Sequence, residues 1–509
     1  MIQRRAHTIA LAAAILIATG GVTRGVSASE PSTVVISQGV DTDTLDPIKH
    51  TITPSTNVQH QLFDTLVIHS ADGKLMPNLA ESFRRTSPTV WEFKLHRNAK
   101  FWNGDPLTSA DVKFTVEKIK DPKYLSDQIP RVNTIVRVDT PDKYTVRYVT
   151  AKPTALIPGF PWVTMIVDAK YWQEHGDAYM AEHPMGSGPY MLKSWKKDEE
   201  LTMDANPAYW GVKPAIAHLV WRPIPEAAAR VAALKTGETD LITNVPVQYE
   251  NQIRGGANTR MTNARSVRVL FIAFNTMQPG PQKDSKLLRQ AFNYAIDVPS
   301  IIKNVLGGHG YQTATPLPNS FFGYDAKIAG YHHDLPKAKA LLAKAGYPDG
   351  KGLDLVINTP NGRYNKDREV AEAIAGQLGA AGVHVTVHTQ EWTSYSNQVS
   401  QRKLTQLYEL GWGNDSYDAD NTLTSLLSST GRLSTYGDPD VDRMIEAARY
   451  EVNPKQRAAM YSRVLAKVYD DAPWLFLFQY EDLYATSKRL NWNARGDELI
   501  FASEMKLAS

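Results

Sequence analysis

The chain has 509 residues, of which 42% are hydrophobic and 21% are charged, a balance typical of soluble globular proteins. This length predicts two or three domains. Cysteine is absent, which excludes disulfides, thiolate metal ligands, a cysteine nucleophile and a lipid-modified cysteine. Three arginines and no acid lie in residues 1–28, so the formal net charge of +3 falls to zero without them. A protein without a basic excess is not expected to bind nucleic acid or anionic lipid.

The first 28 residues have the layout of a secretory signal peptide. Arg4 and Arg5 precede an apolar stretch at 9–18, and small residues lead to Ala28, where we expect cleavage. The stretch is shorter than the roughly 20 residues that span a bilayer. We therefore expect a soluble, exported, periplasmic protein without a lipid anchor.

The next elements are predicted from alternation, turn residues and caps. A strand at 33–37 is followed by a loop with the sequence DTDTLDP, a helix at 55–66 and a half-buried strand at 92–95. Thr108 or Ser109 can cap a helix that starts near Ala110. The segment GSGPYMLKSW predicts a tight turn that leads into a strand, because its spacing matches no phosphate-binding motif.

A strand–loop–helix unit occupies residues 269–297. Its apolar run at 269–274 indicates a buried strand, and apolar residues recur at helical spacing over 287–296. Farther along, Asp334 caps a helix that ends at Gly346. A strand at 353–358, a helix at 369–378 and a strand at 383–387 follow. This alternation predicts a parallel α/β sheet.

A polar segment, GWGNDSYDADN at 411–421, holds the most concentrated group of acids. One interpretation is a solvated loop whose aspartates cap a helix. A calcium loop is a second interpretation, although the glycine and distal glutamate of an EF-hand are missing. No zinc motif, nucleophile elbow or other catalytic arrangement is present. We therefore expect neither a metal site, a cofactor nor catalytic residues.

Several phrases together resemble the family 5 extracellular solute-binding proteins, the peptide, opine and nickel receptors of ABC importers. They are TLDP, FWNGDPLTSADV, GSGPY, ARVAALKTGETDLI, and FNT followed by LRQAFNYAID. The resemblance implies an α/β, two-lobed periplasmic binding protein fold (type II, cluster C-like) with an extra subdomain in the first lobe. The implied division is a signal peptide at 1–28, lobe I at 29–66, 191–270 and 479–509, the extra subdomain at 67–190, and lobe II at 271–478. Hinges are expected near 265–275 and near 480.

The same resemblance implies a ligand site. Gly411, Trp412 and Asp415 match a G-W-x-x-D phrase whose aspartate pairs with a peptide's ammonium group, and a fixed carboxylate suits a desolvated ammonium. A ligand carboxylate would suit the guanidinium of Arg363. The other residues expected to bind ligand are Tyr364, Trp392, His50 and Thr51.

Simpler interpretations stay open for two of these residues, because His50 suits a solvent-facing loop and Arg363 suits an ordinary surface. The expected function is capture of a short peptide or related amino compound by a monomeric receptor that serves an ABC permease. The alternatives are an opine, oligosaccharide or nickel-chelate receptor and, less well supported, a secreted hydrolase.

Overall fold

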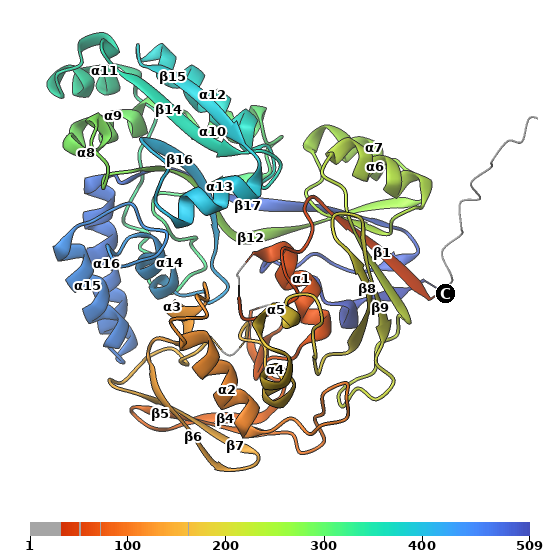
Figure 1. Cartoon of the computed structure of the whole chain (residues 1–509). Coiled ribbons are helices and arrows are strands. Elements are labelled where there is room, and N and C mark those ends of the chain that lie inside the picture. The colour runs from red at the N-terminus through yellow and green to blue at the C-terminus, as the bar shows by residue number, and fades with distance from the viewer. Residues whose placement is uncertain (1–31, 50–51, 72, 161, 509) are drawn as a thin grey trace, which may run out of the picture.

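Two long antiparallel strands, β12 (Thr259–Phe274) and β17 (Trp474–Ser487), cross the middle of the molecule (Figure 1). The computed structural model describes residues 32–49, 52–71, 73–160 and 162–508. On each side of the two strands the sheet continues, so one 11-stranded sheet passes through both halves of the protein. The pairing of β12 with β17 shifts register between Arg265 and Val269 and again between Leu270 and Phe271. These irregularities lie where the first hinge was expected.

The first half of the sheet is built from segments that are far apart in the sequence. Beyond β17 come β11 (Leu241–Ile242), β1 (Thr33–Gln38), β10 (His218–Pro223), β9 (Glu200–Ala205) and β8 (Tyr190–Lys196). The helical segments of this half are α1 (Thr53–Leu62), α6 (Ala227–Thr236), η1 (Val247–Tyr249) and α7 (Glu250–Arg254). The helix expected at 55–66 starts and ends earlier, because Pro54 suits its first turn and the backbone is extended from Phe63.

A four-stranded antiparallel sheet forms the lower part of the molecule in Figure 1. Its order is β4 (Ala80–Ser87), β5 (Val90–Leu95), β7 (Thr145–Thr150) and β6 (Ile135–Asp142). Around it lie the hairpin of β2 (Val67–His69) and β3 (Leu75–Pro77) and the helices α2 (Ser109–Lys120), α3 (Ile129–Val132), α4 (Ala169–His175) and α5 (Asp177–Met180). Helix α2 begins as expected, because Thr108 and Asp111 form a capping box.

The second half of the large sheet contains β16 (Leu407–Gly413), β14 (Asp354–Pro360) and β15 (His384–Gln390), and β13 (Gly310–Gln312) pairs with β17. The prediction of a parallel sheet is correct only in part. Strand β14 is parallel to β15 and β16, whereas β12 is antiparallel to both β16 and β17. Strands β14, β15 and β16 are joined through helices, a connection that allows neighbouring strands to be parallel. Strands β12 and β17 enter this half from the other one in opposite directions, so the sheet cannot be parallel throughout.

Helices surround this second half. In chain order they are α8 (Pro281–Asp284), α9 (Lys286–Ala295), α10 (Val298–Asn304), α11 (Leu335–Lys344), η2 (Pro348–Gly350), α12 (Asp367–Ala380), α13 (Trp392–Ser400), α14 (Ala419–Leu426), α15 (Pro439–Tyr450) and α16 (Pro454–Asp471). The chain ends with β18 (Leu490–Asn491), η3 (Ala502–Glu504) and β19 (Lys506–Leu507).

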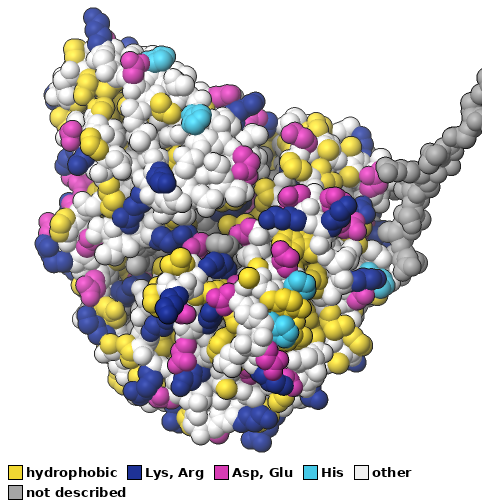
Figure 2. Space-filling view, viewed as in Figure 1, with side chains coloured by type: hydrophobic (Ala, Val, Ile, Leu, Met, Phe, Trp, Pro, Cys, Tyr) yellow, Lys and Arg dark blue, Asp and Glu magenta, His cyan; other side chains and the backbone are white. Residues whose placement is uncertain are grey.

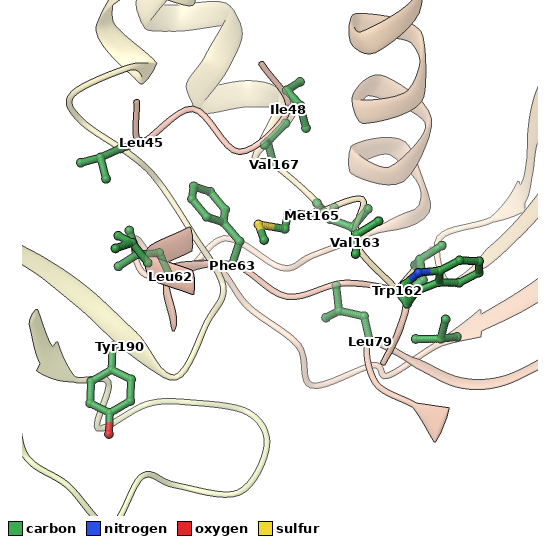
Figure 3. Packing of buried hydrophobic residues seen from close by; sticks show 14 of the residues in the cluster. Leu45, Ile48, Leu62, Phe63, Leu79, Trp162, Val163, Met165, Val167 and Tyr190 are labelled. Atoms are coloured by element: carbon green, nitrogen blue, oxygen red, sulfur yellow. The ribbon is translucent and has the colours of Figure 1, made fainter. Parts of the chain in front are cut away.

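One hydrophobic core joins the lower sheet to the first half of the large sheet. Figure 3 shows part of it, where Phe63 at the end of α1 lies close to Met165, with Leu62 on one side and Val163 on the other. The turn before β8 also packs on α1. A Cβ atom on Gly186 would lie 1.8 Å from the Leu62 carbonyl oxygen, so this position requires glycine. Residues of the predicted extra subdomain therefore share one core with the first half of the large sheet.

Candidate ligand-binding cleft

A cleft of about 1700 Å³ lies between the two halves. In the space-filling view, basic and acidic side chains gather along the hollow that crosses the molecule (Figure 2). The volume exceeds the roughly 300–1,000 Å³ of typical small-molecule pockets. Five of the seven expected ligand-binding residues line this one cleft: Arg363, Tyr364, Trp392, Trp412 and Asp415.

Asp415 lies on the wall of the cleft, in the loop between β16 and α14. Asn414 fixes this loop, because its side-chain amide donates to the Asp418 carbonyl and to the Thr422 hydroxyl, both at 2.8 Å. The Asp415 side chain has no ion-pair partner in the described part of the chain, and a side-chain hydrogen bond from the nearby Trp162 indole helps to lower its pKa. Burial raises the pKa of Asp415, although Arg131 and His69 act in the opposite direction. A desolvated carboxylate without an ion pair favours a cationic partner.

The other two acids of the 411–421 segment have structural roles. Asp418 caps α14 and binds Arg457, whereas Asp420 binds Arg449 at 3.1 Å. The capping interpretation is therefore correct for Asp418. These ion pairs occupy both carboxylates with guanidinium groups. Asp415 alone of the three lines the cleft.

Arg363 and Tyr364 lie in the loop between β14 and α12, as the sequence suggested. The Asp367 carboxylate accepts hydrogen bonds from the backbone N–H groups of Gly362, Arg363 and Tyr364 at 2.9–3.1 Å, which fixes the loop. The Arg363 guanidinium lies 4.9 Å from the Tyr364 ring and 5.2 Å from the Trp392 ring. Its Nε is buried without a hydrogen-bond partner among the described residues, and burial lowers its pKa. A half-buried cation with unused donors favours an anionic partner.

Aromatic side chains complete this wall. Trp392 begins α13, and its ring meets that of Tyr364 edge-on, with centroids 6.1 Å apart. Trp412 lies in β16 opposite Val269, and its buried Nε1 has no acceptor in the described part of the chain. The Tyr364 hydroxyl donates to the Gly411 carbonyl at 3.2 Å and so ties the β14–α12 loop to β16. His50 and Thr51 lie outside the described residues, whereas Ile52 and Thr53 line the cleft.

Sequence reasoning missed a buried charged pair on the floor of the cleft. Arg268 of β12 binds the Glu498 carboxylate, with its Nε 2.7 Å from Oε1, and also donates to the Gly411 carbonyl at 2.8 Å and to the Thr53 hydroxyl at 3.1 Å. Burial alone would raise the pKa of Glu498, but Arg268, with Arg363 and the Ser266 hydroxyl, outweighs burial and lowers it. The one sequence feature that hinted at this pair is the charged Arg268 in an otherwise apolar part of its strand. Its partners come from three distant segments, which no local pattern connects.

Two further charged residues of the lining were also missed. Arg131 lies within α3, and Asp497 follows β18; both line the cleft. Asp497 accepts two hydrogen bonds from Arg495. The described residues contain no cluster of three or more His, Cys, Asp or Glu side chains suited to a metal ion. None of the helices in the described ranges combines the length and apolar character needed to cross a bilayer.

Two α/β halves that share a sheet and enclose a polar, aromatic-lined cleft define a two-lobed ligand-binding protein. The family model for bacterial extracellular solute-binding proteins, family 5, matches residues 74–434, so the chain belongs to this family. Its members serve ABC importers as solute-binding proteins. The fold is that of the two-lobed, type II periplasmic binding proteins.

Three known proteins show what this chain is similar to. It is 27% identical over 480 residues, or 90% of each chain, to DdpA of Escherichia coli (strain K12), whose name is probable D,D-dipeptide-binding periplasmic protein. The structure of DppA from Helicobacter pylori with the peptide STSA matches with a TM-score of 0.85 at 24% identity, covering 93% of this chain and 98% of that one. AgaA from A. tumefaciens R10 with agropinic acid matches with a TM-score of 0.84 at 26% identity, covering 94% and 99%.

Proposed function

We propose that this protein captures a short peptide or related amino compound between its two lobes and delivers it to the permease of an ABC importer. The observation that carries the proposal is Asp415, a desolvated carboxylate with a raised pKa that faces the cleft. A ligand ammonium would supply the positive ion-pair partner that the Asp415 carboxylate lacks. Such pairing offsets the free-energy cost of burying both groups. The peptide named with DppA and the dipeptide in the name of DdpA support the same ligand class.

The remaining residues of the cleft suit the rest of such a ligand. Arg363 binds the ligand carboxylate, because its guanidinium offers paired donors that a carboxylate can accept. Trp412, Trp392 and Tyr364 pack against the body of the ligand. His50 and Thr51 contact it from the first lobe. The lobes close because only the closed arrangement lets both walls touch the ligand.

The proposal also covers the export of the protein and its division into lobes. Residues 1–28 form a cleaved signal peptide, and the mature protein is a non-lipidated, monomeric, periplasmic receptor that binds no nucleic acid. Lobe I comprises 29–66, 191–270 and 479–509 with the subdomain 67–190, and lobe II comprises 271–478. The crossing strands β12 and β17 support hinges near 265–275 and 480, since they connect the two halves.

The test is mass spectrometry of small molecules retained by the mature protein purified under native conditions. We expect short peptides or amino compounds, and we expect Asp415→Ala to release them. Asp440→Ala is the matched control, because Asp440 is an exposed aspartate of α15 that forms an ion pair with Arg443 of the same helix. A retained oligosaccharide or nickel chelate that survives Asp415→Ala would refute the role of Asp415.

A receptor for an opine is the second candidate, favoured by the similarity to AgaA with its agropinic acid. It differs from the peptide proposal in the bound molecule, which the same spectra identify. A hydrolase would consume a peptide on incubation, and unchanged peptide recovered after release would refute that alternative.

A further inference from the structure

One histidine joins the two halves of the protein beside the crossing strands. His309 lies in the second half, between α10 and β13, and its ring contacts two carboxylates. Its Nδ1 lies 2.8 Å from Oε2 of Glu481, on the crossing strand β17. Its Nε2 lies 2.8 Å from Oε2 of Glu250, which begins α7 in the first half. The second contact therefore links the loop after α10 to a helix of the opposite half (Figure 1).

These two hydrogen bonds fix the protonation state of the ring. An ionised carboxylate only accepts hydrogen bonds, so both ring nitrogens have to donate, and only the imidazolium form carries a proton on each nitrogen. The side chain of His309 is 14% exposed, and those of Glu250 and Glu481 are 20% and 22% exposed. Because partly buried charges are screened less than exposed ones, the contact keeps its strength in salt. Burial lowers the pKa of His309, but the two glutamates outweigh burial and raise it.

Neighbouring side chains hold both carboxylates in place. Arg254 of α7 donates to Oε1 of Glu250 at 2.7 and 2.9 Å. Burial alone would raise the pKa of Glu250, but Arg254 and His309 outweigh burial and lower it. Asn263 of β12 donates to Oε1 of Glu481 at 2.8 Å. Each glutamate thus has a second donor and presents its other oxygen to the histidine.

Two further cations lie near this cluster but do not bind its carboxylates. Arg265 of β12 pairs in register with Glu481, yet its guanidinium lies 4.1 Å from the Tyr311 ring and donates to the Gln479 side chain at 2.8 Å. Lys303 of α10 is exposed and forms no ion pair among the described residues. When the pH rises above the range in which carboxylates titrate, the first proton that the cluster loses is therefore that of the histidine.

The same two segments also pack together next to His309. A Cβ atom on Gly307 would lie 3.1 Å from the Cβ of Val247, so the loop after α10 lies against η1 of the first half. Tyr249 of η1 lines the cleft, and Glu250 follows it directly. The contact therefore joins the second half to a segment that forms part of the cleft wall in the first half.

We propose that His309 is a pH-sensitive brace across the hinge. With a proton on each ring nitrogen it binds α7 to the loop after α10 and favours the observed arrangement, in which Arg432 and Asp127 also meet across the cleft. A neutral imidazole has one N–H and can donate to only one glutamate. Rising pH therefore breaks one of the two bonds and shifts the protein toward an open arrangement. The inference rests on the lobe movement of the proposed function and on no particular ligand.

The test measures the distance between the lobes in the mature protein, freed of ligand by unfolding and refolding. The chain has no cysteine, so cysteines introduced at the exposed positions Leu125, beside the lower sheet, and Val452, in the second half, take spin labels selectively. Double electron–electron resonance then gives the populations of closed and open molecules. We expect the ratio of closed to open molecules to fall about two- to fivefold between pH 5.5 and pH 9, as for one partly exposed ion pair.

Two variants separate the brace from the other titrating groups of the protein. We expect His309→Gln and Glu250→Gln each to remove this fall, and the double variant to behave like either single one, because all three lack the same contact. His384→Gln is the matched control, since His384 pairs with Asp354 at 2.7 Å within the second half, and it should keep the full pH response.

The outcomes are distinct from those for the ligand. A pH response that persists in His309→Gln or in Glu250→Gln overturns the inference, as does a constant ratio of closed to open molecules in the natural protein. Either result leaves the proposed function standing, because that function is judged by the molecules that the protein retains. If the cleft retains no amino compound but the pH response follows His309, the proposed ligand class fails and the brace remains.

Discussion

Arg457 and Asp418 form a doubly hydrogen-bonded ion pair whose side chains are only 4% and 5% exposed. The Nη1–Oδ2 and Nη2–Oδ1 distances are 2.5 and 2.7 Å. This pair joins α16 to the N-terminus of α14 and so supports the loop that carries Asp415. Asp418 and Asp420 therefore stabilise the fold, whereas Asp415, the third acid of that segment, lines the cleft.

Loss of this pair should destabilise the protein strongly. Arg457→Met leaves the Asp418 carboxylate buried without its partner, a change that typically costs about 3–5 kcal/mol. Urea denaturation should show a lower midpoint, and ligand affinity should fall because the Asp415 loop loosens. Arg443→Met is the control, since the Arg443–Asp440 pair is exposed and worth about 1 kcal/mol or less. Equal effects of the two variants would contradict this assignment.

Asp415→Asn should stabilise the ligand-free protein at neutral pH. Burial raises the pKa of Asp415, so the folded state favours the protonated form. The stability that this proton contributes is full at low pH and is lost as the pH rises from the ordinary Asp pKa of about 3.9 through the raised value. The melting temperature of the variant should exceed that of the natural protein at pH 7, and the difference should shrink below pH 4. Asp440→Asn should show no such trend.

Closure of the cleft should depend on Arg432. This residue, between α14 and α15, binds Asp127, next to α3 of the opposite half, at 2.7 Å. Arg432→Gln removes a partly exposed ion pair, worth about 1 kcal/mol at most. We expect ligand dissociation to accelerate about two- to fivefold in stopped-flow measurements, with a more open average shape in small-angle scattering. Arg137→Gln, which breaks a pair within one half, should change neither.

His309 should make stability depend on pH in the opposite direction to a buried neutral histidine. Burial lowers its pKa, but hydrogen bonds to Glu481 and Glu250, both at 2.8 Å, outweigh burial and raise it. A raised histidine pKa contributes stability that is full below about pH 6.5 and is lost as the pH rises through the folded value. Compared with His309→Gln, the natural protein should be more stable at pH 5.5 and lose that advantage by pH 9 in urea titrations. A constant difference across this range would contradict the assignment.

Gly186→Ala should prevent correct folding, because its Cβ would lie 1.8 Å from the Leu62 carbonyl oxygen and 2.8 Å from the Trp102 ring. The cost should exceed about 3 kcal/mol, as for severe overpacking. Gly376→Ala, in the middle of α12 with no atom within 4 Å of the new Cβ, should instead stabilise by up to about 1 kcal/mol. Yield of folded protein and melting temperature distinguish the two.

Features that depend on neighbouring residues were predictable from the sequence. The cap at Asp334 and the capping box at Thr108 lie where the pattern placed them, because capping uses atoms within a few residues. Strand β12 was only partly predicted: its apolar end was clear, whereas residues 259–265 carry mixed side chains that only pairing with β17 makes a strand.

The candidate site was less accessible to this reasoning. Asp415, Arg363 and Trp392 could be proposed from motif and loop position, and they do line one cleft. Arg131 could not, since it lies in a four-residue helix without periodicity. Nor could Glu498, whose partner Arg268 is 230 residues away in the chain. Charge pairing over such separations is decided by the folded geometry and leaves no trace in local sequence.

The placement of Asp497 and Glu498 has a consequence for the order in which the protein acquires its activity. Both line the cleft, and Glu498 binds Arg268 of a crossing strand, 230 residues earlier in the chain. During synthesis, when the N-terminal part of a chain emerges first, the floor of the cleft cannot be assembled until residue 498 has been made. A nascent chain that stops short of this residue therefore lacks part of the ligand site, although both crossing strands are already present.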